Sequence, residues 1–235
     1  MSRLAHHLMN LISNEIFLYT SEEAVNVFVK KEKIHIAPNS IMYKSECNVG
    51  VSANRKNLIY SGRLEKSKNL ENLVSAFISS QLWNTGSKLI IIGDGSCHNS
   101  LQLIVSRLRF TSYIEFHGEI SDVNILGELY SSARMAVGPG YGGLNIVQAN
   151  SFGVPIVLDK FSDHAPEIAL VKFNGIIKTD FTSIENMERA IKLFYEVFDW
   201  DLEKRRTLAT NVSQVYCISN MVNAFVSEIR NQLRN

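Results

Sequence analysis

The chain has 235 residues with a formal net charge of +1, and 46% of them are hydrophobic, which fits one large or two small domains with a sizeable core. A charge this close to zero gives no indication of nucleic-acid binding, and no apolar run approaches the roughly 20 residues of a membrane helix. The three cysteines lie far apart and form neither a disulfide framework nor a zinc-binding spacing. The N-terminus is too polar for a signal peptide. We therefore expect a protein of the cytoplasm.

The segments before residue 57 are short. We expect a helix over residues 4–12, a strand over 15–19, a helix over 22–30 that begins at Ser21, a strand over 33–37 and a polar linker over 44–56.

From residue 57 onward, short apolar runs alternate with segments of helix length. We expect strands over 57–61, 88–92, 113–116, 133–137 and 154–158, and helices over 69–79, 97–108, 122–131 (with Ser121 as its N-cap) and 145–152. Continuous apolar strands are typical of sheets covered on both faces, and this alternation predicts a doubly wound, Rossmann-like parallel sheet. Ligands bind such sheets in the loops that follow the strands.

The C-terminal part is expected to close the domain with helices. A short strand over 175–178 precedes a helix over 185–198, for which the run from Thr182 to Glu185 matches a capping box. Two more helices are expected over 201–214 and 217–232. In the last one, Val222, Phe225, Val226 and Ile229 recur at helical spacing, which indicates packing rather than function.

A glycine-rich loop, residues 138–144 (Gly-Pro-Gly-Tyr-Gly-Gly-Leu), separates the strand at 133–137 from the helix at 145–152. Such a turn at a helix N-terminus directs backbone N–H groups and positive potential at one spot, which suits a phosphate or a sugar hydroxyl. Glycine is also the default residue wherever a turn needs unusual dihedral angles. Both interpretations stay open at this point.

Polar residues follow three other strands at the same predicted edge. A basic loop, residues 62–68, carries Arg63, which can bind phosphate bidentately, and Lys68, a point charge; a solvated loop is the alternative. The turn Gly93-Asp94-Gly95 favours a structural role. His164 and Glu167 follow the strand at 154–158.

Several motifs in order resemble the donor-binding half of the retaining family-4 glycosyltransferases, which have the GT-B architecture. LIYSGRLEKSKNLENLVSAF resembles the family's Gly-Arg-Leu…Lys signature, KLIIIGDGS its Gly-x-Gly loop, and GLNIVQANSFGVPIV the helix before its Gly-x-Pro. LYTSEEAVNVF and KIHIAPNSI resemble the end of the family's first domain. The resemblance implies an N-terminal acceptor-domain remnant with linker at 1–50, a nucleotide-sugar-binding domain at 51–198 and closing helices at 199–235.

By this resemblance, Arg63 and Lys68 would hold the donor diphosphate and stabilise its charge as it leaves. The residues expected at the donor are Gly62, Gly93, Gly95, Ile120, Gly140, Gly142, Gly143, Leu144, Gln148, His164 and Glu167. Gly142, Gly143 and Leu144 would offer backbone N–H groups, and Ile120 would lie against the base. The family carries no metal requirement, so we expect no metal and no cofactor beyond the nucleotide sugar as co-substrate.

Two departures from the family pattern matter. Its two glutamates correspond here to Gly140 and Gln148, and Gln148 can bind ribose hydroxyls only as a neutral group. In addition, most of the acceptor domain lies outside the resemblance.

We expect hexosyl transfer with retention to a glycan or lipid-linked acceptor, in the assembly of a surface polysaccharide such as lipopolysaccharide. The first alternative is a donor-binding subunit that needs a partner polypeptide with an acceptor domain. The second is an epimerase or phosphorylase relative, which would need carboxylates that Gly140 and Gln148 do not supply. The base, the sugar, the acceptor and a peripheral contact with the inner face of the membrane stay open.

Overall fold

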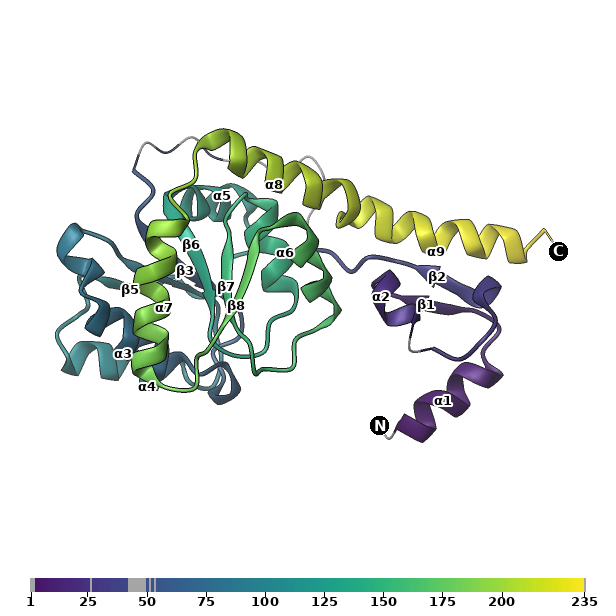
Figure 1. The fold of residues 1–235 in the computed structure, drawn as a ribbon, viewed down its shortest axis with the longest axis horizontal. Coiled ribbons are helices and arrows are strands. Elements are labelled where there is room, and N and C mark those ends of the chain that lie inside the picture. Colours follow the sequence, from purple (N-terminus) through teal and green to yellow (C-terminus); the bar gives the residue numbers. More distant parts are fainter. Residues whose placement is uncertain (1–2, 26, 42–49, 51, 53, 235) are drawn as a thin grey trace.

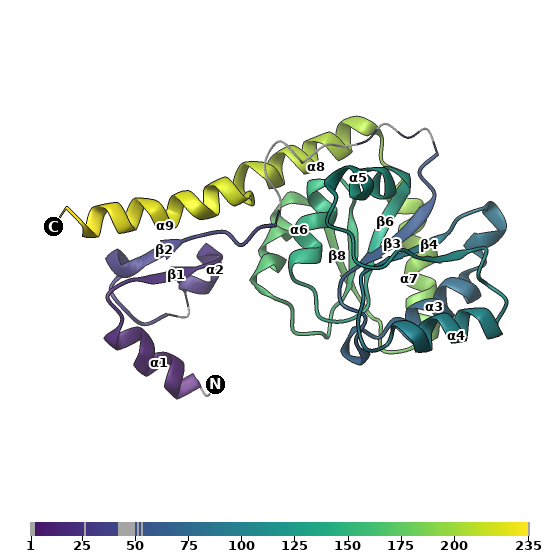
Figure 2. The same cartoon turned by 180° about the vertical axis from the view of Figure 1, so that it is seen from behind.

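The computed structural model of the chain describes every residue except 1–2, 26, 42–49, 51, 53 and 235. Within the described residues, the main body is a parallel sheet in the order β5-β4-β3-β6-β7-β8, with helices on both faces (Figures 1 and 2). Its strands are β3 (Asn57–Ser61), β4 (Leu89–Ile92), β5 (Ile114–Phe116), β6 (Ala133–Gly138), β7 (Ile156–Asp159) and β8 (Ile176–Thr179). The predicted α/β class with a doubly wound parallel sheet is confirmed.

Alternate side chains of each strand enter two cores, one on each face of the sheet. Leu58 and Tyr60 of β3 lie in the core that includes helices α3 (Leu70–Ser80), α4 (His98–Arg107) and α7 (Ile184–Val197). Ile59 lies in the other core, with α5 (Val123–Ser132), α6 (Leu144–Ser151) and α8 (Leu202–Val215). Because both faces are covered, the strands are largely apolar, although the edge strands β5 and β8 carry Glu115 and Lys178.

The position of β3 between β4 and β6 creates a switch point in the sheet. The chain leaves β3 toward α3 on one face, and it leaves β6 toward α6 on the other. The loops that follow these two strands therefore diverge, and the opening between them is where doubly wound sheets bind ligands.

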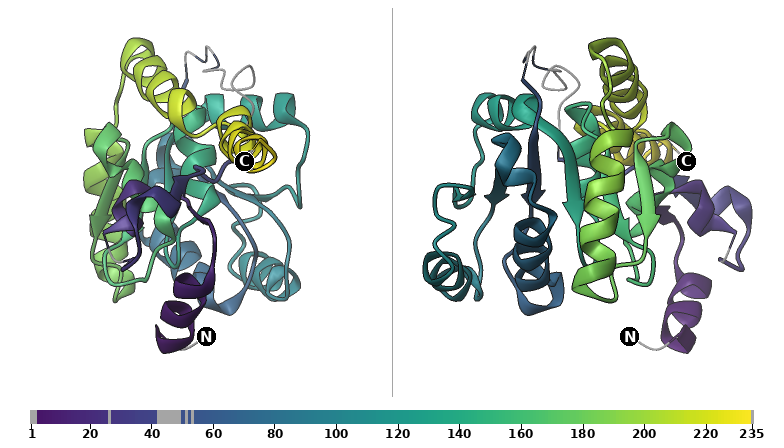
Figure 3. Two further views of the ribbon diagram at one scale, coloured as in Figure 1. Left: turned by 90° about the vertical axis from the view of Figure 1, so that its right-hand side faces the viewer. Right: turned by 60° about the vertical axis from the view of Figure 1, so that its left-hand side comes forward.

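A small N-terminal unit lies beside the main body. Its strands β1 (Ile16–Leu18) and β2 (Ile34–Ile36) pair in parallel, and helices α1 (Arg3–Ile12) and α2 (Ser21–Ala24) accompany them. Helix α9 (Ile218–Gln232) continues from α8 and extends to this unit (Figures 1 and 3). Phe225 of α9 lies 4.4 Å from the ring of Phe17. Helix α9 therefore packs against the small sheet, and α1 lies on the other side of that sheet (Figure 1).

Three helix-end predictions are wrong. Helix α2 ends at Ala24 rather than residue 30, and Thr20 and Glu23, not Ser21, form its capping box; β-branched residues at 25, 27 and 29 disfavour a longer helix. The N-cap of α5 is Asp122, which accepts from the Asn124 N–H at 2.8 Å, rather than Ser121. The N-cap of α7 is Ser183, which accepts from the Asn186 N–H, so the predicted box from Thr182 to Glu185 is absent.

The remaining N- and C-terminal predictions have mixed outcomes. Helix α9 lies where predicted, but it buries no residue among those described, and Val222 and Ile229 stay 45% and 57% exposed. Most of the predicted linker at 44–56 lies outside the described residues. The division at residues 50 and 198 stays a prediction.

Candidate functional site

A cavity of about 680 Å³ opens at the carboxyl ends of the central strands. It is lined by Ser61, Gly62, Arg63, Ile92, Gly93, Asp94, Gly95, Glu119 and Ile120. The structure thus brings together Arg63 and four of the residues expected at the donor, from three separate loops. It adds Ser61, Asp94 and Glu119, which the sequence motifs did not single out because they are ordinary polar residues beside the glycines.

Two glycines allow the backbones of these loops to touch. A Cβ atom at Gly93 would lie 2.0 Å from the Gly62 carbonyl oxygen, and one at Gly95 would lie 2.6 Å from that of Leu64. Both glycines also have positive φ angles, of 125° and 156°, which side chains disfavour. The Leu64 N–H donates to the Asp94 carbonyl at 2.8 Å. The turn is therefore structural, as predicted, and it also lines the cavity.

The backbone of the basic loop is held by Tyr60, a residue that the sequence did not indicate. The Tyr60 hydroxyl donates to the Arg63 carbonyl at 2.9 Å, and burial raises the pKa of Tyr60 above its usual value, with Glu65 adding to the effect. The Arg63 side chain is 76% exposed and pairs with Glu65 at 3.0 Å. A buried hydroxyl thus holds the backbone while the guanidinium remains in solvent.

The glycine-rich loop contacts the basic loop at Gly140. A Cβ atom there would lie 2.5 Å from the Ser67 carbonyl oxygen and 3.1 Å from the Lys68 Cα. Lys68 Nζ donates to the Tyr141 carbonyl at 2.7 Å and lies 4.9 Å from the Tyr141 ring. This close approach gives a steric reason for glycine where the family pattern has a glutamate.

Lys68 is the more enclosed of the two cations. Burial lowers its pKa, and the nearby charge of Arg63 lowers it further, while Glu65 acts in the opposite direction. The like charges of Arg63 and Lys68 repel each other at one end of the sheet. A bound diphosphate would relieve this repulsion, which favours its binding there.

Two of the three predicted backbone donors are engaged within the chain. The Gly142 N–H donates to His164 Nδ1 at 3.0 Å, and the Gly143 N–H donates to Asn145 Oδ1 at 2.8 Å. Among the hydrogen bonds of the described residues, none comes from the Leu144 N–H, which as the first residue of α6 has no partner within the helix. The first two N–H groups would have to exchange partners to bind a ligand.

His164 positions the glycine-rich loop. Its Nε2 lies 2.7 Å from the Asp159 carbonyl oxygen, which can only accept a hydrogen bond, so Nε2 carries the proton and Nδ1 accepts from Gly142. The imidazole therefore bridges the end of β7 to the loop, and both of its nitrogens are occupied.

Glu167 is buried close to the start of α6. It lies in a 3₁₀ helix (Pro166–Phe173) and is 2% exposed. Its Oε1 accepts from Asn39 Nδ2 at 2.7 Å, whereas Oε2 is buried and has no hydrogen-bond partner in the described part of the chain. A Cβ atom at Gly143 would lie 4.0 Å from Oε2. An unpaired carboxylate oxygen thus faces the loop, and Asn39, 128 positions away in sequence, is a partner that no local pattern could reveal.

Gln148 is held by two hydroxyl groups. Its side-chain oxygen accepts from Ser61 Oγ at 2.6 Å and from the Tyr130 hydroxyl at 3.2 Å. Burial raises the pKa of Tyr130 and keeps that hydroxyl protonated. Since Ser61 also lines the cavity, Gln148 lies one side chain behind its wall, with its amide orientation fixed.

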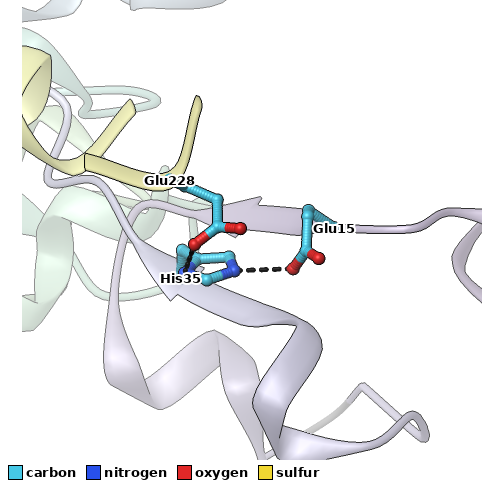
Figure 4. Close-up of side chains that lie close together, drawn as sticks. All are labelled: Glu15, His35 and Glu228. Atoms are coloured by element: carbon cyan, nitrogen blue, oxygen red, sulfur yellow. Dashed lines mark hydrogen bonds and ion pairs between the residues drawn. The ribbon is translucent and has the colours of Figure 1, made fainter. Parts of the chain in front are cut away.

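One cluster with metal-ligand chemistry exists among the described residues, and it lies away from the cavity. Glu15, His35 and Glu228 meet where α9 reaches the N-terminal unit (Figure 4). His35 Nε2 lies 2.7 Å from Glu15 and Nδ1 lies 3.7 Å from Glu228, while Gln232 Nε2 donates to both carboxylates at 2.9 Å. These mutual contacts describe a polar link between α9 and the small sheet.

The fold and this cleft define an α/β domain of the kind found in GT-B glycosyltransferases. Residues 48–214 match the model of the family described as Glycosyl transferases group 1, and the chain belongs to that family. A comparison with curated proteins found no match. No helix in the described part of the chain combines the length and apolarity needed to cross a bilayer.

Solved structures share the fold at low sequence identity. A glycosyltransferase from Rickettsia africae is 12% identical with a TM-score of 0.75, over 100% of this chain and 68% of that one. Sucrose-phosphate synthase from Thermosynechococcus elongatus is 15% identical, also with a TM-score of 0.75, over 98% and 61%. Anabaena HepE in complex with UDP is 18% identical, with a TM-score of 0.69, over 97% and 67%. The chain therefore spans about two thirds of these proteins.

Proposed function

We propose that the chain is the donor-binding half of a retaining glycosyltransferase that transfers a hexosyl group from a nucleotide sugar to a glycan or lipid-linked acceptor. The observation that carries the proposal is the cavity at the switch point, where Arg63 lines one wall and Lys68 is held against the glycine-rich loop. Fixed cations beside a helix N-terminus favour an anionic group whose charge grows during reaction.

The proposed reaction needs no nucleophile from the protein. The acceptor hydroxyl attacks the anomeric carbon on the face from which the diphosphate leaves, and a diphosphate oxygen takes the hydroxyl proton. Arg63 and Lys68 stabilise the negative charge of the leaving group in place of a metal ion. The unpaired oxygen of buried Glu167 is suited to accept a hydrogen bond from a sugar hydroxyl.

The similar structures favour UDP as the nucleotide and a surface glycan as the product. Anabaena HepE was solved with UDP, and the pneumococcal O-GlcNAc transferase GtfA with UDP and GlcNAc. Another similar structure is a lipopolysaccharide galactosyltransferase. We place the reaction in the cytoplasm, at the inner face of the membrane, where lipid-linked acceptors are presented.

The direct test is nucleotide binding by the purified chain. UDP, GDP and ADP are compared by thermal shift, since a ligand that binds only the folded form raises its stability. We expect a shift with UDP that the Arg63→Ala/Lys68→Ala variant abolishes. Lys66→Ala is the matched control, because Lys66 is exposed in the same loop. No shift with any nucleotide, from a chain that melts cooperatively, would refute donor binding.

A second candidate is a donor-binding subunit that transfers sugar only with a partner polypeptide. The small sheet favours it: β1 and β2 pair only with each other among the described strands, although parallel strands need cover on both faces. On α1, Leu8, Leu11 and Ile12 are 54%, 52% and 82% exposed. This candidate predicts UDP binding by the chain without transfer to an added acceptor; turnover by the chain alone would exclude it.

A further inference from the structure

Three arginines meet at the amino ends of the central strands, whereas the cavity lies at their carboxyl ends. Arg55 precedes β3, Arg134 is the second residue of β6, and Arg205 projects from α8. Arg134 Nε donates to the Arg55 carbonyl at 3.1 Å, and Arg205 Nη2 donates to the Arg134 carbonyl at 2.9 Å. Arg55 Nη1 donates to the Trp200 carbonyl at 3.2 Å. The three side chains thus form one connected cluster at the amino ends of β3 and β6.

The cluster carries more positive charge than its protein partners neutralise. Among the described residues, the one carboxylate paired with it is Asp199, which lies 3.2 Å from Arg134 Nη2 and is 75% exposed. Arg205 is only 2% exposed. Burial lowers the pKa of Arg205 to about 10, and the charges of Arg55 and Arg134 contribute to that shift. At neutral pH three guanidinium groups therefore share a single, solvated carboxylate.

Two buried donors in the cluster have no acceptor among the described residues. These donors are Arg55 Nε and Arg205 Nε. Arg134 is more fully engaged: its Nη1 donates to the Tyr195 carbonyl at 3.4 Å, and its guanidinium lies 4.3 Å from the Tyr195 ring. Nη2, which pairs with Asp199, is therefore the Arg134 donor that an anion would take over. Unpaired buried donors in a native structure call for an explanation, and a missing ion is one of the few available.

We propose that Arg55, Arg134 and Arg205 form a binding site for a phosphate-bearing anion. A phosphate monoester carries close to two negative charges at neutral pH, which matches the two charges that Asp199 leaves uncompensated, and arginine forks bind phosphate oxygens bidentately. Asp199, which pairs with Arg134, is the solvent-exposed member of this group. The phosphate belongs either to a soluble ester or to a lipid headgroup.

Trp200 provides a local readout of this site. Its carbonyl accepts from Arg55, and Lys204 Nζ lies 4.1 Å from its ring. The only other tryptophan is Trp83, which packs against Phe110 and Tyr113. In a Trp83→Phe background, fluorescence therefore reports on Trp200 alone. Inorganic phosphate is titrated against sodium chloride at matched ionic strength, and circular dichroism verifies the fold of each variant.

We expect a saturable response to phosphate that persists in the Arg63→Ala/Lys68→Ala variant, which separates this site from the cavity. Arg134→Gln should weaken phosphate binding about tenfold, the loss typical of one charge-assisted hydrogen bond. Asp199→Asn should strengthen it, because a competing carboxylate is removed. Arg206→Gln is the matched control, since Arg206 is exposed on the same helix as Arg205, and it should leave the affinity unchanged.

Vesicles distinguish the two sources of phosphate. Cosedimentation with phosphatidylcholine vesicles containing phosphatidic acid, whose headgroup is a phosphate monoester, but not with pure phosphatidylcholine, identifies a lipid headgroup. A fluorescence response without cosedimentation identifies a soluble ester. The proposal is overturned if neither probe binds, if Arg206→Gln loses as much affinity as Arg134→Gln, or if Asp199→Asn weakens binding. If Arg134→Gln does not fold, phosphate affinity is measured in two other variants. Arg134→Lys keeps the charge but not the guanidinium fork and should bind phosphate more weakly, and Asp199→Asn should bind it more tightly.

Discussion

Gly140 lies where the glycine-rich loop meets the basic loop, and replacing it with alanine tests whether that contact builds the donor site. The new Cβ would lie 2.5 Å from the Ser67 carbonyl oxygen, where ordinary contact begins at 3.4 Å. The two loops would therefore have to separate by about 0.9 Å, the difference between these distances. Overpacking of this kind typically costs about 1–3 kcal/mol of folding free energy. Lys68 follows Ser67 directly, so the separation also moves its ammonium group.

The assay for Gly140→Ala has two readouts: the free energy of unfolding in urea and the dissociation constant for UDP. We expect a stability loss of about 1–3 kcal/mol together with clearly weaker UDP binding. Gly127→Ala is the matched control, because this glycine is inside α5 and its Cβ would meet only Phe152 at 3.6 Å. That variant should gain about 0.5–1 kcal/mol with unchanged affinity. If Gly140→Ala keeps both its stability and its affinity, the close approach of the loops does not build the site.

Three further predictions concern Lys68 and the buried carboxylate of Glu167. Because the pKa of Lys68 is lowered by burial and by Arg63, its ammonium group is lost at a lower pH than that of a free lysine. UDP affinity should therefore fall as pH rises through that range, and Arg63→Ala should move the fall to higher pH; a midpoint that does not move would contradict the coupling. Glu167→Gln removes a buried, unpaired carboxylate oxygen, so the free energy of unfolding in urea should stay equal or rise. The same variant should lose affinity for the UDP-sugar but keep its affinity for UDP. Asn39→Ala takes the donor from Glu167 Oε1 and should cost about 1.5–3 kcal/mol in the same unfolding assay.

The main sheet could be predicted closely because its signals are local. β3 spans the predicted residues 57–61, since a strand buried on both faces is a continuous apolar run with a glycine after it. Helix α2 was predicted to exist, but its length was wrong, because the helix that begins at the capping box of Thr20 and Glu23 ends at Ala24, before the apolar pattern does. Helix α9 was predictable as a helix. Its packing partner was not, because the helix packs against β1, which lies more than 200 positions away in sequence.

The candidate site shows the same division between local and distant signals. Glycines 93 and 95 could be identified from sequence as a tight turn, and the structure gives the backbone contacts that require them. Gly62 was expected only from the family resemblance, and a Cβ atom there would lie 3.0 Å from the Tyr60 hydroxyl. The partner of Glu167 and the two hydroxyls that hold Gln148 come from distant segments, so no motif could indicate them. The placement of His164 beside the loop was predictable, whereas its role as a bridge between Asp159 and Gly142 depends on the conformation of that loop.

The two family glutamates are absent here for different physical reasons, and this difference can be tested. At Gly140 any side chain would collide with the Ser67 carbonyl, so Gly140→Glu should destabilise the chain at least as much as Gly140→Ala. At Gln148 the side-chain oxygen already accepts from Ser61 and Tyr130, and a glutamate carboxylate of the same length can accept both bonds. We therefore expect Gln148→Glu to fold, with a stability below that of the parent chain because its charge is buried beside two neutral hydroxyls. If position 148 binds ribose hydroxyls, the variant should bind UDP at least as tightly, because a carboxylate is the stronger acceptor. Weaker UDP binding by a stable Gln148→Glu variant would instead mean that the amide N–H groups bind the ligand, which would make Gln148 a donor where the family pattern has an acceptor.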